Sequence, residues 1–155
     1  MKHPKTVALL AFLVAVGAAP LAKAQGAAKP LASTTLDAGA VAEVIESARK
    51  DGTLTVRVRF SNPGVKPVKL KLVDAQGYVH TYISSGNTKY PLIRDTSGKD
   101  VATPRDGGGW LEPTIKPKAS WGWWGKFAAP PASQKTYTLY FKEGPPIEDV
   151  PIVDK

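Results

Sequence analysis

The sequence predicts an all-β domain, an antiparallel β-sandwich of about seven strands, that follows a cleaved signal peptide. Three observations support this prediction. Apolar and polar side chains alternate in several short segments, 14 Gly and 14 Pro residues separate these segments, and an apolar stretch lies near the N-terminus. A period of two indicates strands with one buried face, and frequent Gly and Pro turns are typical of antiparallel sheets. A barrel built from the same strands is the alternative.

The first 24 residues have the organisation of a secretory signal peptide. Lys2, His3 and Lys5 form a basic start, residues 7–19 are mainly apolar, and Ala22-Lys23-Ala24 matches the small-x-small cleavage rule. The apolar stretch is shorter than the roughly 20 residues of a membrane-spanning helix. We therefore expect a periplasmic or extracellular protein, exported by a signal peptide over residues 1–24, with no transmembrane anchor in the mature chain.

Composition limits the classes of partner and chemistry. The chain has no cysteine, which excludes disulfides, thiol catalysis and cysteine metal ligands. Three of its 21 Lys and Arg residues and none of its 13 acids lie in the signal segment, so the remaining 18 basic and 13 acidic residues leave a net charge of +5. This charge favours another envelope or exported protein, or an acidic cell-surface polymer, as partner. No nucleic-acid-binding pattern is present, so we expect no nucleic-acid partner.

The mature chain divides into a flexible leader over residues 25–39 and one domain over residues 40–155. Residues 41–50 are compatible with a strand or a helix and precede an Asp51-Gly52 turn. Residues 53–60 alternate strictly and predict a strand with one face on a core. The predicted inward residues of this strand are Leu54, Val56, Val58 and Phe60, and its outward residues include Arg57 and Arg59.

The next segments predict a turn and further short strands. Residues 61–64 read as a type II turn in which Gly64 supplies a positive φ. Residues 67–73 alternate between apolar side chains and the lysines Lys69 and Lys71. Residues 78–83 are compatible with a short strand or a helix, and residues 90–94 predict a strand that ends at the 95–98 turn.

The remaining elements follow a loop rich in Gly and Pro. Three of the four tryptophans lie within the segment Trp121–Trp124, "WGWW". A period of two places Trp121, Trp123 and Phe127 on the core face and Trp124 on the other face. Residues 136–142 alternate again, with Tyr137, Leu139 and Phe141 on one face. Residues 145–155 predict a last irregular strand, since the apolar residues Ile147, Val150 and Ile152 recur in it.

Four segments resemble the immunoglobulin-like β-sandwich domains of exported bacterial proteins: Phe60–Gly64, Lys66–Val68, Phe127–Pro131 and Thr136–Phe141. In that family an N-x-G turn precedes a K-P-V strand, and an F-x-A-P-P segment precedes the final strand. The resemblance covers residues 41–152 and implies an immunoglobulin-like fold and an extracytoplasmic location. Because the Cys…Trp…Cys pattern of antibody domains is absent, only the architecture is implied.

No residue pattern indicates catalysis, so the sequence predicts a protein that is not an enzyme and needs no metal or cofactor. The predicted mature chain has one histidine, His80, and no serine lies in a Gly-x-Ser-x-Gly motif. Asp95 and Asp100 bracket a turn that lacks the alternating ligands of a calcium loop. Glu148 and Asp149 are adjacent, so in a strand they point to opposite faces.

Two groups of residues are candidates for a binding surface. Arg57, Arg59, Lys69 and Lys71 would form a basic patch if their two strands were neighbours, unless acids such as Glu43 or Glu46 compensate them. Trp110 and Trp124 are candidate exposed aromatics. We expect a non-enzymatic protein-interaction or structural module of the bacterial cell envelope. The alternative is a carbohydrate-binding module that uses Trp110, Trp124 and Tyr140 for cell-wall or lipopolysaccharide sugars.

Overall fold

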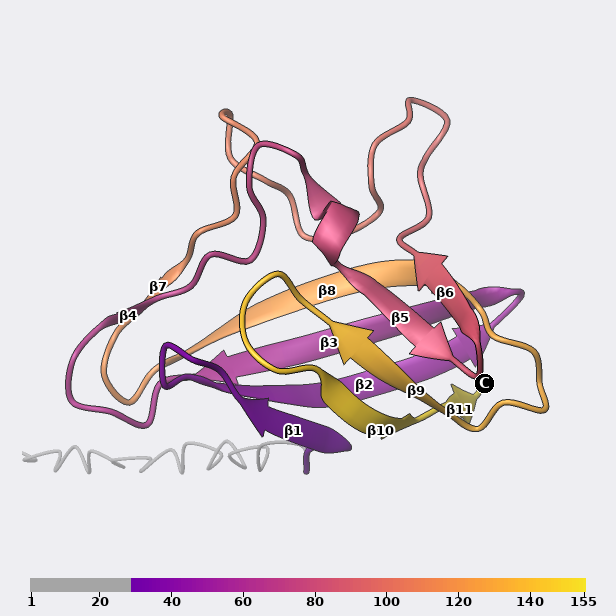
Figure 1. Ribbon diagram of the computed structural model, residues 1–155, viewed down its shortest axis with the longest axis horizontal. Coiled ribbons are helices and arrows are strands. Elements are labelled where there is room, and N and C mark those ends of the chain that lie inside the picture. Colours follow the sequence, from indigo (N-terminus) through magenta and orange to yellow (C-terminus); the bar gives the residue numbers. More distant parts are fainter. Residues whose placement is uncertain (1–28) are drawn as a thin grey trace, which may run out of the picture.

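A computed structural model describes residues 29–155 and shows an all-β fold of antiparallel sheets (Figure 1). One 3-10 turn, Tyr78–His80, is the only helical segment in this range. The predicted signal peptide, residues 1–24, lies outside the described residues, as do residues 25–28 of the predicted leader. Over residues 29–155 no helix has the length and apolar character needed to cross a membrane.

The strands form two main sheets and one small pair. The first sheet has the order β1-β2-β3-β8, with β11 added in parallel to β2, and the second has the order β10-β9-β5-β6. The third pairs β4 with β7. The strand bounds are β1 Ala32–Thr35, β2 Val41–Lys50, β3 Thr53–Ser61, β4 Val68–Lys69, β5 Tyr82–Ser85, β6 Thr88–Pro91, β7 Thr114–Ile115, β8 Ser120–Ala128, β9 Thr136–Tyr140, β10 Ile147–Pro151 and β11 Val153–Asp154.

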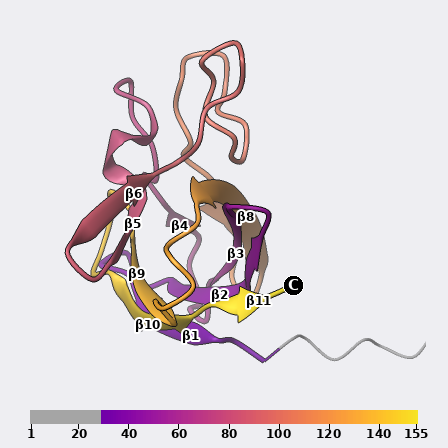
Figure 2. The same ribbon diagram turned by 90° about the vertical axis from the view of Figure 1, so that its right-hand side faces the viewer.

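The two main sheets face each other across one hydrophobic core, as expected for a sandwich, and Figure 2 shows them end-on. Single bridges from Leu92 to Phe127 and from Ala102 to Gly125 tie the chain after β6 to β8. The sheets therefore approach each other along this side of the core. On the opposite side the chain runs directly from β10 in the second sheet into β11 in the first, so the sandwich also has partial closure of the kind that the barrel alternative would have.

Strand β3 confirms the clearest sequence prediction. Its four predicted inward residues, Leu54, Val56, Val58 and Phe60, are each 0% exposed. The preceding turn also matches, because Asp51 and Gly52 have φ values of 48° and 72°, the pair of positive angles that a type I′ hairpin turn requires.

Residues 41–50, compatible with either element type, form strand β2. The pairing with β3 shifts between Val44 and Glu46, so Ile45 is the extra residue of a β-bulge. Beyond the bulge the alternation changes phase, and Arg49 pairs with Leu54 on the inward side of the sheet. A strict period of two would have directed Arg49 outward.

Arg49 fixes the C-terminal segment to this end of the fold. Its Nε and Nη2 donate to the two carboxylate oxygens of Asp154 at 2.6 and 3.0 Å, and its Nη1 donates to the carbonyls of Pro130 and Pro131 at 3.0 and 2.8 Å. The guanidinium lowers the pKa of Asp154 through this hydrogen bond. The side chain is 8% exposed, so this cation is a buried structural clamp.

Two sequence predictions are corrected here. Part of the predicted flexible leader is ordered, since Ala32–Thr35 form β1 and pair with Val41–Val44 of β2; backbone pairing at the open edge of β2 needs no periodic side-chain pattern. Gly64 does not have the predicted positive φ. The Asn62 side chain instead accepts a hydrogen bond from the Gly64 amide at 2.9 Å, which makes an Asx turn.

The segments predicted as strands over residues 67–94 are only partly strands. β4 has two residues, although Leu70 and Leu72 beyond it are buried and their amides bond to Pro113 and Leu111. The segment from residue 78 begins with the 3-10 turn, which precedes β5. The strand predicted over residues 90–94 is observed as β6, which begins two residues earlier.

Strand β8 contains the tryptophan segment. Trp123 and Phe127 are 2% and 0% exposed, as predicted, whereas Trp121 is only half-buried. The Trp123 ring packs edge-on against Phe141 with centroids 5.0 Å apart. In the C-terminal segment Ile147, Val150 and Ile152 are buried, and β10 carries a bulge, which confirms the predicted irregular strand.

Candidate binding site

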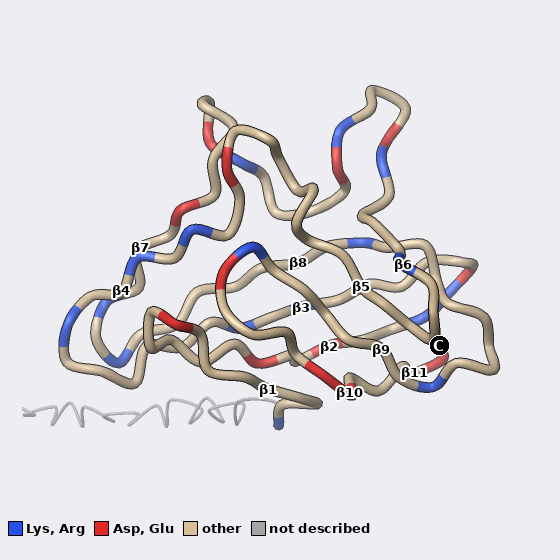
Figure 3. Tube along the Cα trace, viewed as in Figure 1, with Lys and Arg blue, Asp and Glu red and all other residues tan. Residues whose placement is uncertain are grey.

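The predicted basic patch does not assemble, because β3 and β4 are not neighbours. β3 lies between β2 and β8, while β4 pairs with β7. On β3, Arg57 Nε lies 2.9 Å from Glu46 Oε2 and Arg59 Nε lies 2.9 Å from Glu43 Oε2. The two arginines are therefore neutralised by the two acids on the adjacent strand, and Figure 3 shows basic and acidic residues interspersed.

The two lysines of the predicted patch also lie apart from these arginines. Lys69 Nζ lies 2.5 Å from Glu112 Oε2, so its charge is paired locally. Lys71 is exposed, and its backbone amide donates to Glu143 at 2.5 Å. A single docking surface for an acidic partner is not formed by these four residues.

The ion pair between Glu43 and Arg59 makes stability depend on pH. The hydrogen bond from Arg59 lowers the pKa of Glu43, although burial acts in the opposite direction. A lowered folded-state pKa means that the stabilisation is present above the unfolded-state pKa, and is lost as the pH falls through the folded-state value.

We expect Glu43→Gln to remove a stabilisation of about 0.2–1 kcal/mol at neutral pH, and we expect the difference from wild type to shrink towards zero at acidic pH, as the carboxyl becomes protonated in the folded state. Thermal unfolding between these pH values measures the difference. Glu148→Gln is the control, since Glu148 is exposed and has no ion pair within residues 29–155. A constant difference at every pH would contradict this assignment.

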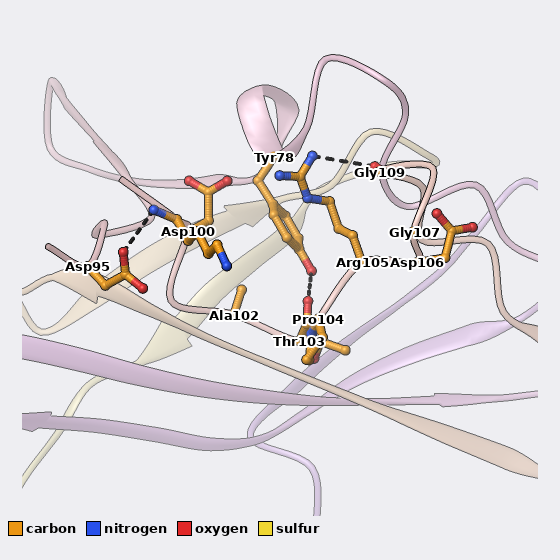
Figure 4. Close-up of a pocket in the computed structure, with 11 residues that line it drawn as sticks. Tyr78, Asp95, Asp100, Ala102, Thr103, Pro104, Arg105, Asp106, Gly107 and Gly109 are labelled. Carbon is orange, nitrogen blue, oxygen red and sulfur yellow. Dashed lines mark hydrogen bonds between the residues drawn. The ribbon is translucent and has the colours of Figure 1, made fainter. Parts of the chain in front are cut away.

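Two long loops rise from one side of the sheets and form the face that we call the loop face, residues 70–81 and 94–113 (Figure 1). It contains two adjoining hollows that share residues 103–106. The first hollow has a volume of about 480 Å³ and is lined by Tyr78, Asp100 and Arg105, among others (Figure 4). The second has a volume of about 500 Å³ and is lined by Trp110, Trp121 and Glu112, among others.

Tyr78 closes the first hollow on the side of the core. Its hydroxyl donates to the Thr103 carbonyl at 2.5 Å and accepts a hydrogen bond from Trp123 Nε1 at 3.4 Å. Burial raises the pKa of Tyr78 to about 12. The phenol is therefore neutral at physiological pH and acts as a fixed hydrogen-bond donor within the fold.

Arg105 lies where the two hollows meet. Its Nη1 donates to the Gly109 carbonyl at 3.4 Å, and a side chain at Gly77 would place its Cβ 3.0 Å from the same nitrogen. No carboxylate within residues 29–155 forms an ion pair with Arg105. The neighbouring Asp106 instead accepts the amides of Gly108 and Trp110 at 3.0 and 2.8 Å. The charge of Arg105 is thus directed to the hollows.

The two predicted tryptophans are separated. Trp110 is 41% exposed and lines the second hollow. Trp124 is half-buried on the outer side of β8, in register with Arg57, and its backbone amide donates to Thr103 Oγ1 at 2.9 Å. Trp121, predicted as core, packs against the core beside Phe60 and also lines the hollow with Trp110.

Tyr140, the third aromatic of the sugar-binding alternative, is already in use. Its ring stacks on Tyr82 with centroids 4.5 Å apart and planes 11° apart. The covered ring face is not available to a ligand. Sequence reasoning missed Arg105 because a single arginine in a loop of Gly and Pro forms no periodic pattern.

The residues considered for catalysis or metal binding do not form a cluster within residues 29–155. His80 is exposed and takes part in no side-chain hydrogen bond recorded over residues 29–155, and no group of three His, Asp or Glu residues in that range could hold a metal ion. Comparison of the chain with protein-family models, curated proteins and solved structures gave no significant match. The resemblance to exported immunoglobulin-like domains therefore stays a prediction.

Proposed function

We propose that the protein is a non-enzymatic module of the bacterial cell envelope, exported by a signal peptide over residues 1–24. It binds another exported protein or an acidic cell-surface polymer through the loop face. The observation that carries this proposal is the pair of adjoining hollows, with Arg105 unpaired between them and Trp110 41% exposed. Trp and Arg are the residue types that most often dominate binding energy at interfaces.

The strand order supports an immunoglobulin-like architecture for this module. If β2 is equated with strand A, the order β2-β3-β8 corresponds to A-B-E, and β10-β9-β5-β6 corresponds to G-F-C-C′. The core tryptophan departs from the antibody pattern, since Trp123 lies on the strand equated with E rather than C. Loops on a rigid scaffold commonly carry the binding residues, which agrees with a site on the loop face.

A carbohydrate-binding module is the second candidate. It is favoured by the presence of Trp110 and Trp121 in one open hollow together with Arg105. Indole rings provide apolar faces on which sugar rings stack, and a guanidinium pairs with a carboxylate in two-point geometry. This candidate uses the same residues as the first, so one set of variants tests both.

We expect Trp110→Ala to weaken binding to the native partner by at least about tenfold, since loss of an interface tryptophan commonly costs more than 1.4 kcal/mol. The measurement is crosslinking in the intact cell envelope, followed by identification of what co-purifies. Retention on purified peptidoglycan and lipopolysaccharide is measured in parallel.

Trp124→Ala is the matched control, because it removes the same side chain from outside the loop face. Circular dichroism of both variants verifies that they fold. Loss of a protein crosslink in Trp110→Ala supports a protein partner, and loss of retention on either polymer supports a cell-surface polymer or sugar as the ligand. If Trp110→Ala retains every partner that wild type has, the loop face is not the binding site.

A further inference from the structure

A second surface, remote from the loop face, lies where two short loops end the molecule along its longest axis (Figure 1). We call it the basic tip: residues 62–67, between β3 and β4, and residues 116–119, between β7 and β8. These segments, "NPGVKP" and "KPKA", contain the three lysines Lys66, Lys116 and Lys118 and no acidic residue. In the first segment Val65 is 83% exposed, the highest value among the exposed large apolar side chains in the described chain.

Asn62 holds the two loops of the basic tip together. It is 2% exposed, and its side-chain amide donates to the carbonyls of Lys66 and Ile115 at 2.8 and 3.0 Å. Its backbone amide donates to Ala119 at 2.9 Å, and its carbonyl accepts the Lys118 amide at 2.9 Å. Because one buried residue bonds to both loops, the three lysines are kept at the same end of the fold.

The charges of the basic tip are not neutralised within the described chain. None of its three lysines forms an ion pair in residues 29–155. Lys118 Nζ donates to the Pro63 carbonyl, which leaves its charge uncompensated. Nearby Lys69, by contrast, is paired with Glu112. Basic residues therefore gather at this end of the molecule, as the left side of Figure 3 shows.

We propose that the basic tip binds an anionic phospholipid surface, with Lys66, Lys116 and Lys118 at the headgroups and Val65 at the headgroup boundary. Lysines near an anionic membrane attract it electrostatically, and a small apolar side chain gains by leaving water at the interface. A terminal pair of short loops is a small contact area, whereas a stable protein interface covers about 800 Å² per partner. A fluid lipid surface can contact such a tip without a complementary shape.

The test uses sedimentation with vesicles that contain phosphatidylglycerol and with vesicles of phosphatidylcholine alone. The wild type should bind only the anionic vesicles and should dissociate in about 0.5 M salt, where screening is strong. The triple variant Lys66→Gln, Lys116→Gln, Lys118→Gln should bind on the order of 100-fold more weakly, since each lysine contributes about fivefold. The single variant Val65→Ser should also weaken binding to the anionic vesicles at low salt.

The matched control is Lys29→Gln, Lys50→Gln, Lys135→Gln, which removes the same charge from exposed positions outside both the basic tip and the loop face. We expect it to retain binding within about fivefold of wild type. Equal losses in the two triple variants would overturn the proposal, because the net charge alone would then explain binding. No binding of wild type to anionic vesicles would overturn it as well. Trp110→Ala should bind vesicles like wild type, which keeps this test independent of the loop face.

Discussion

Replacing Trp123 by alanine is expected to lower the free energy of unfolding by about 3–5 kcal/mol, the usual cost of deleting a large buried aromatic side chain. Trp123 is 2% exposed and lies between the rings of Phe141, Phe127 and Tyr78, with centroids 5.0, 6.4 and 6.4 Å away. Its removal leaves a cavity bounded by both sheets and takes away the indole donor to the Tyr78 hydroxyl.

Equilibrium unfolding in urea, followed by circular dichroism, measures this loss. Trp124→Ala is the comparison, since Trp124 precedes Gly125 on the same strand but is half-buried on its outer side. We expect it to cost about 1 kcal/mol. Equal losses in the two variants would mean that the outer side of β8 is as tightly packed as the core, contrary to the burial of the two rings.

Gly125→Ala is expected to destabilise the fold by about 1–3 kcal/mol, the cost typical of an overpacked core. A Cβ at this position would lie 2.5 Å from Cη2 of Trp123 and 2.8 Å from Cδ2 of Leu92. The indole ring of Trp123 thus occupies the space that a side chain at residue 125 would need. The bridge between Gly125 and Ala102 limits how far the backbone can move to relieve the contact.

Gly122→Ala is the matched control on the same strand. A Cβ at residue 122 would meet no atom within 4 Å, so we expect a change within about 0.5 kcal/mol of wild type. Thermal unfolding of both variants makes the comparison. A destabilisation in Gly122→Ala as large as that in Gly125→Ala would indicate a general intolerance of side chains on β8 rather than a specific contact with Trp123.

The strands that sequence alone identified share a regular period and a turn with a defined chemistry. β3 and β9 alternate without interruption, and Asp51-Gly52 sets the hairpin before β3. Their inward residues were therefore correctly predicted as core. The core role of Trp123 followed from the same period on β8.

Other elements depend on interactions that no local pattern encodes. The bulge at Ile45 reverses the alternation of β2, so that Arg49 turns inward. β1 is ordered by backbone pairing with β2, which does not require a particular side-chain pattern. The 3-10 turn after Gly77 is closed by a local bond from the Thr81 amide to the Tyr78 carbonyl, but the Tyr78 hydroxyl that it positions bonds to Thr103 in a distant loop.

The candidate sites were predicted least well, because neighbourhood in the sheet decides which side chains meet. The basic patch assumed that β3 and β4 are adjacent, yet β2 supplies Glu43 and Glu46 to the arginines of β3. Trp110, a candidate exposed aromatic, is 41% exposed. Its neighbours Trp121 and Arg105 come from a strand and a loop whose proximity only the tertiary structure shows.

The clamp at Arg49 has a consequence for the order in which a nascent chain can fold. Arg49 belongs to the β2–β3 hairpin, but its counter-charge, Asp154, lies 105 positions later. Until Asp154 has emerged from the ribosome, the Arg49 guanidinium lacks the carboxylate with which it pairs in the folded domain. The β2–β3 hairpin can form early, while the end of the sheet that contains Arg49 matures only once Asp154 has been synthesised, which favours slow, non-local completion of the domain.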